Sequence, residues 1–175
     1  MKNYKKKILI TGSSGFIGNC LKIFLKKKFE LYFIDKKKLK YKEKNFILLN
    51  LTNKKRVYKL IKIIRPDIII HLAAQSNLEE IKNRKKYVQN NIVATNNLLE
   101  SMKLYNIKNI IFSSSASIYS DTNKKVTEKS NFFPKNIYAQ TKLSCEKNII
   151  KKSKTINLNY IIFRFFNVCS ALKKP

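Results

Sequence analysis

Histidine, cysteine, glycine and proline are all scarce in this chain of 175 residues, and tryptophan is absent. The single histidine, His71, and three widely spaced cysteines, Cys20, Cys145 and Cys169, cannot build a zinc site of the usual His/Cys kind. No two cysteines stand in a C-x-x-C pattern. We therefore expect three reduced thiols and no metal.

Long apolar runs are missing as well. No segment approaches the roughly 20 apolar residues of a membrane span, and the first apolar run, Ile8 to Ile10, is too short for a signal peptide. These absences predict a cytoplasmic protein without a membrane partner. The hydrophobic fraction of 44% is ordinary for a folded chain. Because no repeat or linker divides it, we expect one domain over residues 1–175.

Acidic residues are outnumbered, since Asp and Glu total 10 against 38 Lys and Arg, for a formal net charge of +28. Such a charge favours weak, salt-sensitive binding to nucleic acid. The lysines are spread over the whole chain, however, and arginine, the usual residue for base recognition, occurs only at positions 56, 65, 84 and 164. This pattern is more typical of a solvated surface, and we expect no specific nucleic-acid partner.

Short apolar segments alternate with helical patterns along the chain. The composition predicts strands at residues 8–11, 31–34, 46–49, 68–70, 109–112 and 160–165. Apolar residues recur with helical period over residues 16–25, 57–64 and 88–105, and a further helix is expected to start near Tyr138. Strands without polar alternation are typical of a sheet buried on both faces. The order predicts an α/β fold, a doubly wound parallel sheet in three αβα layers.

All three glycines stand in one loop, between the first predicted strand and the first predicted helix. The spacing Gly12-x-x-Gly15-x-x-Gly18 suits a tight turn that lets a diphosphate approach the backbone. The helix N-terminus then offers N–H groups and a partial positive charge to the phosphates. The chain holds no glycine elsewhere, which argues against a chance cluster. The loop therefore predicts a dinucleotide-binding Rossmann fold.

Asp35 ends the second predicted strand, where a carboxylate binds the adenosine ribose hydroxyls in such folds. A carboxylate at this position repels a 2′-phosphate, which favours NAD over NADP. Lys36, Lys37 and Lys38 follow directly and are suited to bind such a phosphate, so NADP stays open.

Tyr138 and Lys142 are four residues apart, so on a helix they share one face. A nearby ammonium and a nicotinamide ring would lower the pKa of the tyrosine, and its phenolate could take a proton from a sugar hydroxyl. Because lysine is abundant, the same spacing recurs at residues 32/36 and 58/62. Only Tyr138 follows the fifth predicted strand, beside the expected cofactor crevice. Ser115, on the loop leaving that strand, could hydrogen-bond the reacting hydroxyl.

Six motifs stand in order along the chain: TGSSGFIG from Thr11, Arg65-Pro66-Asp67 with IIIHLAAQ to Gln75, NNIVATNNLLE from Asn90, FSSSASIY from Phe112, YAQTK from Tyr138 and RFFNV from Arg164. In these motifs nearly the whole chain resembles the N-terminal part of the NAD-dependent epimerase/dehydratase family, the extended short-chain dehydrogenases. Within that family it is most similar to nucleotide-sugar epimerases such as UDP-glucose 4-epimerase.

The resemblance implies a role for each matching residue. The cofactor NAD would be held by Gly12, Gly15, Phe16, Ile17, Gly18, Asp35, Leu51, Leu72, Ala73, Ala74, Asn90, Tyr138, Lys142 and Phe166. The catalytic residues would be Ser115, Tyr138 and Lys142. The substrate would contact Ser115, Tyr138 and Asn167.

The resemblance also implies epimerisation of a nucleotide sugar, a UDP-hexose, through transient oxidation at C4. Ala116 and Ser117 stand where dehydratases of the family carry an Asp-Glu pair, which disfavours loss of water. A homodimer is expected, because helices matching residues 88–105 and the Tyr138 helix commonly pair in the family. Most of the family's C-terminal substrate domain lies beyond the matching part, so we expect it to be largely absent here. A Rossmann module that binds NAD without turnover is therefore the alternative.

Overall fold

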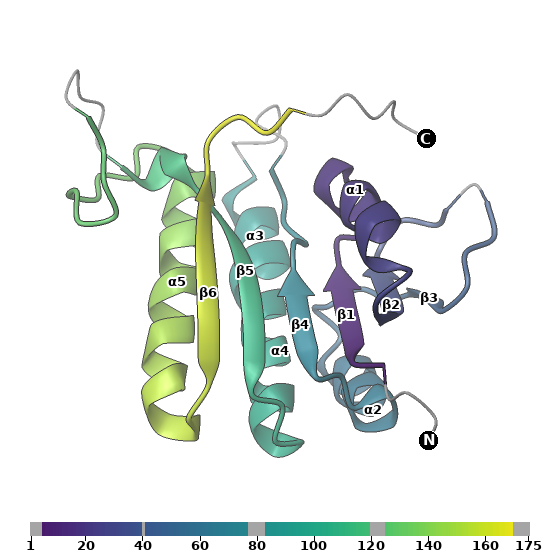
Figure 1. Cartoon of the computed structure of the whole chain (residues 1–175). Helices are drawn as coiled ribbons and strands as arrows, with labels where there is room; N and C mark the ends of the chain where they lie inside the picture. The colour runs from purple at the N-terminus through teal and green to yellow at the C-terminus, as the bar shows by residue number, and fades with distance from the viewer. Residues whose placement is uncertain (1–4, 40, 77–82, 120–124, 170–175) are drawn as a thin grey trace.

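The computed structural model describes residues 5–39, 41–76, 83–119 and 125–169. Its centre is a parallel sheet of six strands in the order β3-β2-β1-β4-β5-β6, whose arrowheads point the same way in Figure 1. The strands are β1 (Lys7–Thr11), β2 (Glu30–Asp35), β3 (Phe46–Leu48), β4 (Ile68–His71), β5 (Asn109–Ser115) and β6 (Asn159–Phe165). This order is that of doubly wound dinucleotide-binding folds, so the predicted α/β class is confirmed.

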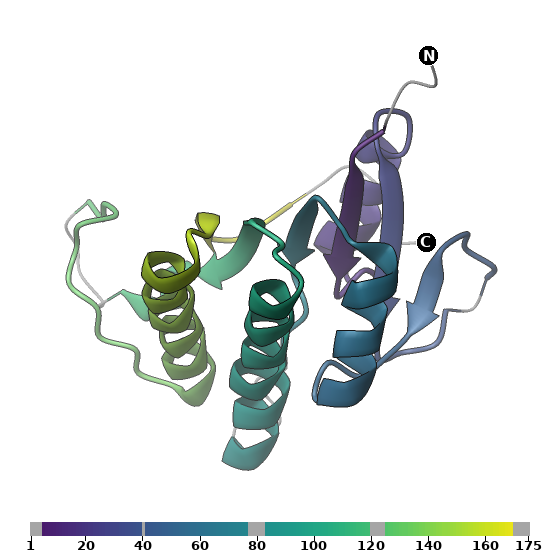
Figure 2. The same ribbon diagram turned by 90° about the horizontal axis from the view of Figure 1, so that it is seen from below.

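Helices cover both faces of the sheet. They are α1 (Phe16–Leu25), α2 (Lys54–Ile64), α3 (Arg84–Tyr87), α4 (Ala94–Leu104) and α5 (Ile137–Ile156), with a π-helix η2 (Val88–Val93) and a 3-10 turn η3 (Ala116–Ile118). Seen from below in Figure 2, α2, α4 and α5 lie side by side on one face, and α1 lies on the other. None of the described helices has the length and apolarity that crossing a bilayer requires.

The core has two parts because side chains alternate between the faces of each strand. Leu9 of β1 packs with Ile69, Leu98 and Ile149 on the face that carries α2, α4 and α5. Its neighbours Ile8 and Ile10, with Leu31, Phe33 and Ile70, pack on the face that carries α1. This division explains why the strands show no polar alternation in the sequence.

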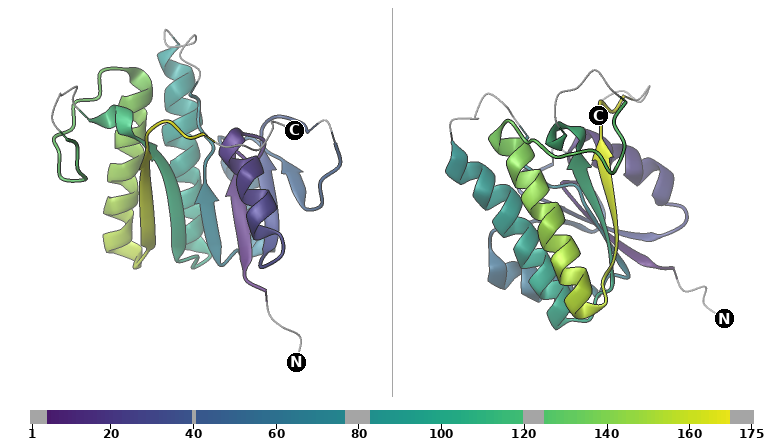
Figure 3. Two further views of the ribbon diagram at one scale, coloured as in Figure 1. Left: turned by 45° about the horizontal axis from the view of Figure 1, so that its top comes forward. Right: turned by 90° about the vertical axis from the view of Figure 1, so that its left-hand side faces the viewer.

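Two expectations about the elements need correction. The single helix predicted over residues 88–105 begins at Arg84 and includes the π-helix η2 before α4. The last strand, β6, is not buried on both faces: Ile161 and Phe163 are 52% and 47% exposed. On its other face α5 runs along β6 (Figure 3), and Ile162 packs into the core there. The cause is that no described helix covers the α1 face of the sheet over β6.

Asparagine side chains cap three of the described helices: Asn53 caps α2, Asn83 caps α3 and Asn136 caps α5. The Asn53 side chain accepts a hydrogen bond from the Arg56 N–H at the start of α2, and Asn136 does the same for Ala139 at the start of α5. Such caps satisfy N–H groups that the first helical turn leaves free. The cap at Asn136 therefore places Tyr138 in the first turn of α5, at the carboxyl edge of the sheet.

Candidate functional site

The glycine loop touches its neighbours too closely for side chains. Gly12 has φ +69°, and a Cβ there would lie 2.6 Å from the Ala73 nitrogen. A Cβ on Gly18 would lie 2.7 Å from the Cα of Ser13. The Gly15 N–H donates to the Gly12 carbonyl over 3.1 Å and closes the turn. Glycine is thus required at Gly12 and Gly18 by contact with backbone atoms, as the sequence predicted.

Helix α1 begins directly after this turn, so its N-terminus lies at the glycine loop. Gly15 is the N-cap, no side chain caps the helix, and its first turn holds no acidic residue. Intrahelical bonds leave the N–H groups of a first turn free. With the helix dipole, these groups of Phe16, Ile17 and Gly18 form a site suited to a phosphate.

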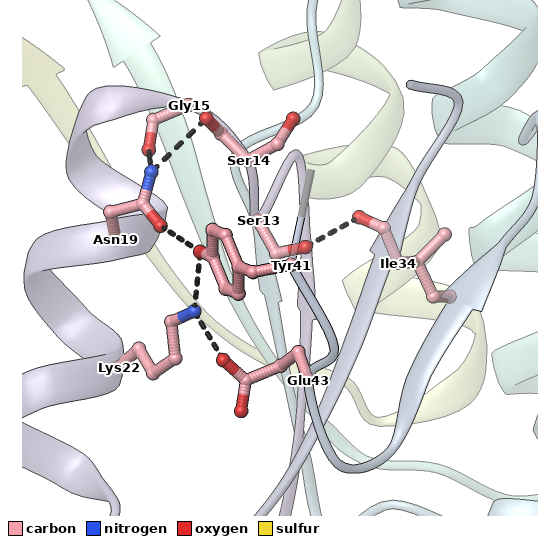
Figure 4. Close-up of polar contacts among 8 residues, drawn as sticks. All are labelled: Ser13, Ser14, Gly15, Asn19, Lys22, Ile34, Tyr41 and Glu43. Carbon is pink, nitrogen blue, oxygen red and sulfur yellow. Dashed lines mark hydrogen bonds and ion pairs between the residues drawn. The ribbon is translucent and has the colours of Figure 1, made fainter. Parts of the chain in front are cut away.

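Asp35, at the end of β2, is fastened to the same loop. Its Oδ2 accepts hydrogen bonds from the Ser14 N–H (3.1 Å) and the Ser14 hydroxyl (2.5 Å), and its Oδ1 accepts from the Lys37 N–H (3.0 Å). The Ser13 hydroxyl donates to the Ile34 carbonyl, as Figure 4 shows. The glycine loop and the end of β2 therefore form one rigid rim with a carboxylate on it.

A cleft of about 480 Å³ runs along the carboxyl edge of the sheet from this rim to α5. Of the residues predicted for the cofactor, all except Phe166 line it. The Phe166 side chain lies outside the lining and is 71% exposed. Ser115 and Asn167, predicted for the substrate, are also outside the lining, although Ser115 contacts Tyr138, which lines it. The cleft thus unites segments from most of the chain.

Sequence reasoning did not assign a cofactor role to several residues of the cleft. These are Ser14, Ile34, Leu49, Asn50, Ser76, Ala94, Ser113 and Val168, whereas Lys36 and Lys37, which also line the cleft, were candidates for a 2′-phosphate. Ser14 and Ser113 belong to motifs quoted above, so their place in the motif is a usable signal. Val168 ends the quoted motif RFFNV as well, although only the path of the chain after β6 brings it to the cleft.

Lys142 is buried at the α5 end of the cleft, with only 2% of the residue exposed. Its Nζ donates a hydrogen bond of 2.6 Å to the Ser113 carbonyl. It also lies 4.8 Å from the ring centroid of Phe112 and 5.8 Å from that of Tyr138. Burial lowers the pKa of Lys142 to about 8, while Cys145 and Glu146 oppose the shift. The ammonium is therefore held by few but close partners.

Tyr138 lies one turn before Lys142 on α5. Burial raises the pKa of Tyr138, and the hydrogen bond with the Ser115 side chain opposes this rise only in part. The lowering predicted for a site that holds both the ammonium and a nicotinamide ring stays a prediction, because in the chain without the ring desolvation is the largest influence on this pKa. Any lowering has to come from charge that a bound cofactor adds.

Behind the cleft lies a buried imidazole. His71 pairs with the Thr11 hydroxyl over 2.7 Å through Nδ1 and with the Thr95 hydroxyl over 2.9 Å through Nε2. Burial, with a smaller effect from the charge of Lys142, lowers the pKa of His71 to about 3. His71 is therefore neutral at ordinary pH and ties β1 and β4 to α4.

Asn91, which sequence reasoning missed, is a second buried support. Its Oδ1 accepts from the Gln75 N–H (2.6 Å), and its Nδ2 donates to the Gln75 carbonyl (3.2 Å) and the Thr141 hydroxyl (2.8 Å). Its neighbour Asn90 lines the cleft instead. Both lie in the π-helix η2, a form that is often found at functional sites. The Asn-Asn pair gave no sign of this division of roles.

The part of the chain that the structure describes contains no candidate metal-binding site. No three His, Cys, Asp or Glu side chains gather there in a way that could hold an ion. The features that point to a ligand are instead the glycine cradle, the free N-terminus of α1 and the Asp35 carboxylate. Together they fit a dinucleotide.

Comparison with known proteins agrees with this geometry. The sequence profile of the NAD dependent epimerase/dehydratase family matches residues 8–175. The dTDP-D-glucose 4,6-dehydratase of Dictyostelium discoideum is 32% identical, over 97% of this chain and 45% of that protein. The solved structure of the UDP-Glc/GlcNAc 4-epimerase from Campylobacter jejuni is 31% identical, with a TM-score of 0.84 over 95% of this chain and 56% of that one.

The structure of UDP-glucose 4-epimerase from Brucella ovis in complex with NAD is 26% identical, with a TM-score of 0.83 over 93% of this chain and 52% of that one. The chain thus spans about half the length of these relatives. Since the family profile covers nearly all of its residues, the chain belongs to the NAD dependent epimerase/dehydratase family.

Proposed function

We propose that this chain is the NAD-binding part of a nucleotide-sugar 4-epimerase that acts on a UDP-hexose. One observation carries the proposal: Tyr138, its partner Ser115 and the buried Lys142 meet at the end of the cleft that starts at the glycine loop. The epimerases among the family relatives support the choice of substrate class.

Different residues of the cleft bind different parts of the cofactor. The N-terminus of α1 holds the diphosphate, and Asp35 binds the adenosine ribose hydroxyls. Lys142 binds the nicotinamide ribose. When bound, NAD would supply the hydride acceptor for the oxidation at the sugar C4 and, once reduced, the hydride donor for the return step. The negative charge of Asp35 selects NAD over NADP, although Lys36 and Lys37 also line the cleft.

The chain's own side chains move the proton. Tyr138 takes the proton of the sugar 4-hydroxyl, and Ser115 hydrogen-bonds that same hydroxyl. The positive charges of Lys142 and of the nicotinamide ring would together stabilise the phenolate once the cofactor is bound. The high pKa of Tyr138 in the chain alone keeps the base protonated until the cofactor is bound.

A dehydratase is the second candidate within the family, because the Dictyostelium relative bears that name. Elimination of water needs an additional acid–base pair near the reacting sugar. The turn η3 that follows Ser115 runs from Ala116 to Ile118 and contains no carboxylate. This turn favours the epimerase.

The proposal is tested with the purified chain and its Tyr138→Phe variant. NADH binding is followed by the fluorescence of the bound nicotinamide, and interconversion of UDP-glucose and UDP-galactose by product analysis. We expect NADH to bind both proteins, and turnover to fall by about 10²–10⁴-fold in the variant. NADH binding without any turnover would identify a Rossmann module instead. A chain that binds no NADH would contradict both readings.

We also propose that the chain forms a homodimer through α4 and α5. These helices pack side by side, with Asn148 donating to the Asn96 side chain over 2.9 Å, and so present one continuous surface. Sedimentation velocity at micromolar concentration tests this, and a monomer would contradict it.

A further inference from the structure

A second hollow, larger than the cleft, lies between α1, β2 and the segment 41–45. Its volume is about 930 Å³, within the range of sites for small organic ligands. It shares Ser14 and Phe16 with the cleft but otherwise draws on different residues. The proposed function gives this hollow no role, and the inference below does not rest on that function.

The floor of the hollow is apolar. Leu31 and Phe33 of β2 form part of it, and both are buried. Cys20 and Ile23 of α1 form the facing wall, and Ile23 is 48% exposed. Phe29 adds a further apolar side chain at the turn between these elements. Binding of an apolar ligand to such a surface is favourable, because it removes apolar area from water.

The segment 41–45 is fastened across the hollow by polar contacts, which Figure 4 shows. The Lys22 Nζ donates to Glu43 (2.5 Å) and to the Tyr41 hydroxyl (3.0 Å). The Tyr41 hydroxyl donates to the Asn19 Oδ1 (3.3 Å). The Asn19 amide in turn donates to the carbonyls of Ser14 and Gly15, each over 3.1 Å. The position of this wall is thus fixed by a connected set of hydrogen bonds and one ion pair.

The charges around the hollow are unbalanced. Four lysines and two glutamates line it. Both glutamates are engaged, because Glu43 pairs with Lys22 and Glu30 accepts a hydrogen bond from the Tyr32 hydroxyl over 2.6 Å. The four lysines thus exceed the two glutamates around the hollow by two positive charges, and Lys26 and Lys44 are without an ion-pair partner among the described residues.

We propose that this hollow binds a small organic anion with an aromatic or other apolar body. The body covers Leu31 and Phe33, and the anionic group pairs with Lys26 and Lys44. An apolar pocket with a few charged groups at one side is the common form of such sites. Neutral apolar ligands leave the ammonium groups unpaired, and small inorganic anions leave the floor uncovered, so neither makes use of both features.

The first test uses 8-anilinonaphthalene-1-sulfonate, an aromatic anion that fluoresces in apolar sites. It is titrated into the whole chain with excess NAD present, so that the cleft is occupied. In the variant Lys26→Glu/Lys44→Glu we expect its dissociation constant to rise about tenfold, which corresponds to about 1.4 kcal/mol. The matched control is Lys59→Glu/Lys62→Glu on exposed positions of α2, with the same change of net charge. Equal weakening in both variants would overturn the proposal, since it would show only general attraction.

The second test locates the probe through Cys20. Cys145 is buried and Cys169 is exposed, so Cys169→Ser removes the competing thiol. Maleimide labelling of Cys20 is then followed by peptide mass spectrometry with and without saturating probe. We expect labelling to slow at least about fivefold when the probe is bound, because the hollow is filled. Unchanged labelling of Cys20 while the probe fluoresces would place the probe elsewhere and refute the site.

Discussion

The Nζ of Lys142 donates a hydrogen bond of 2.6 Å to the carbonyl oxygen of Ser113. This contact joins the first turns of α5 to the end of β5 by a buried charge. Burial lowers the pKa of that ammonium to about 8, which means that the buried position disfavours the charged form. Such a perturbed group beside a cleft is typical of functional sites, where ligand binding uses the charge.

Replacing Gly12 by alanine tests the close approach of the glycine loop to β4. The new Cβ would lie 2.6 Å from the Ala73 nitrogen at a φ of +69°. We expect the free energy of unfolding to fall by about 2–4 kcal/mol and NADH binding to be lost. Urea unfolding and NADH titration measure both. Ser14→Ala, in the same loop but without a new atom, is the control and should unfold with much less loss.

Acid should destabilise the chain through His71, which is its only histidine. The imidazole has a pKa near 6.5 when unfolded and about 3 when folded. Between these values the unfolded state binds one more proton, so the free energy of unfolding falls as pH falls, by about 1.4 kcal/mol per pH unit. Urea unfolding at pH 7, 6 and 5 checks this slope. His71→Gln should remove most of it in that range, and an equal slope in the variant would show that other groups are responsible.

Arg164 and Glu146 form an ion pair, with Nη2 and Oε2 2.9 Å apart, in which Glu146 is buried (1% exposed) and Arg164 is partly buried. Arg164 also donates to the Tyr119 hydroxyl (2.7 Å) and the Glu128 carbonyl (2.9 Å). Arg164→Met should cost about 3–5 kcal/mol of unfolding free energy, because it leaves a buried carboxylate unpaired. The double variant Arg164→Met/Glu146→Leu should recover most of that loss. If both variants unfold at the same denaturant concentration, charge burial is not the cause.

Asp35 should control the choice between NADH and NADPH. Asp35→Asn keeps an oxygen that can accept from Ser14 but removes the charge that repels a 2′-phosphate. Since Lys36 and Lys37 line the cleft, we expect the ratio of NADPH to NADH affinity to rise about tenfold or more. Fluorescence titration with both nucleotides measures this ratio. Glu100→Gln on α4, with the same change of charge, should leave it unaltered.

Much of the fold follows from local patterns. The glycine spacing, Asp35 at a strand end and the apolar segments each express constraints that act within a few residues, and they predicted the element order and most of the predicted cofactor residues that line the cleft. The exposed face of β6 could not be predicted, because whether Ile161 and Phe163 are covered depends on which helices pack there. The π-helix around Asn91 escaped prediction because six residues of i→i+5 bonding inside a longer helical segment are too few to change its apolar pattern visibly.

The amino-acid pattern alone decided the nucleotide-binding class, since glycine, helix start and acidic residue lie close together along the chain. Tertiary packing alone decided the electrostatics of the site. The contact of Lys142 with Ser113 spans 29 residues, and that of Arg164 with Glu146 spans 18. Burial raises the pKa of Tyr138 in the chain without cofactor, and desolvation of this kind depends on every neighbour in space, which no spacing along the chain contains.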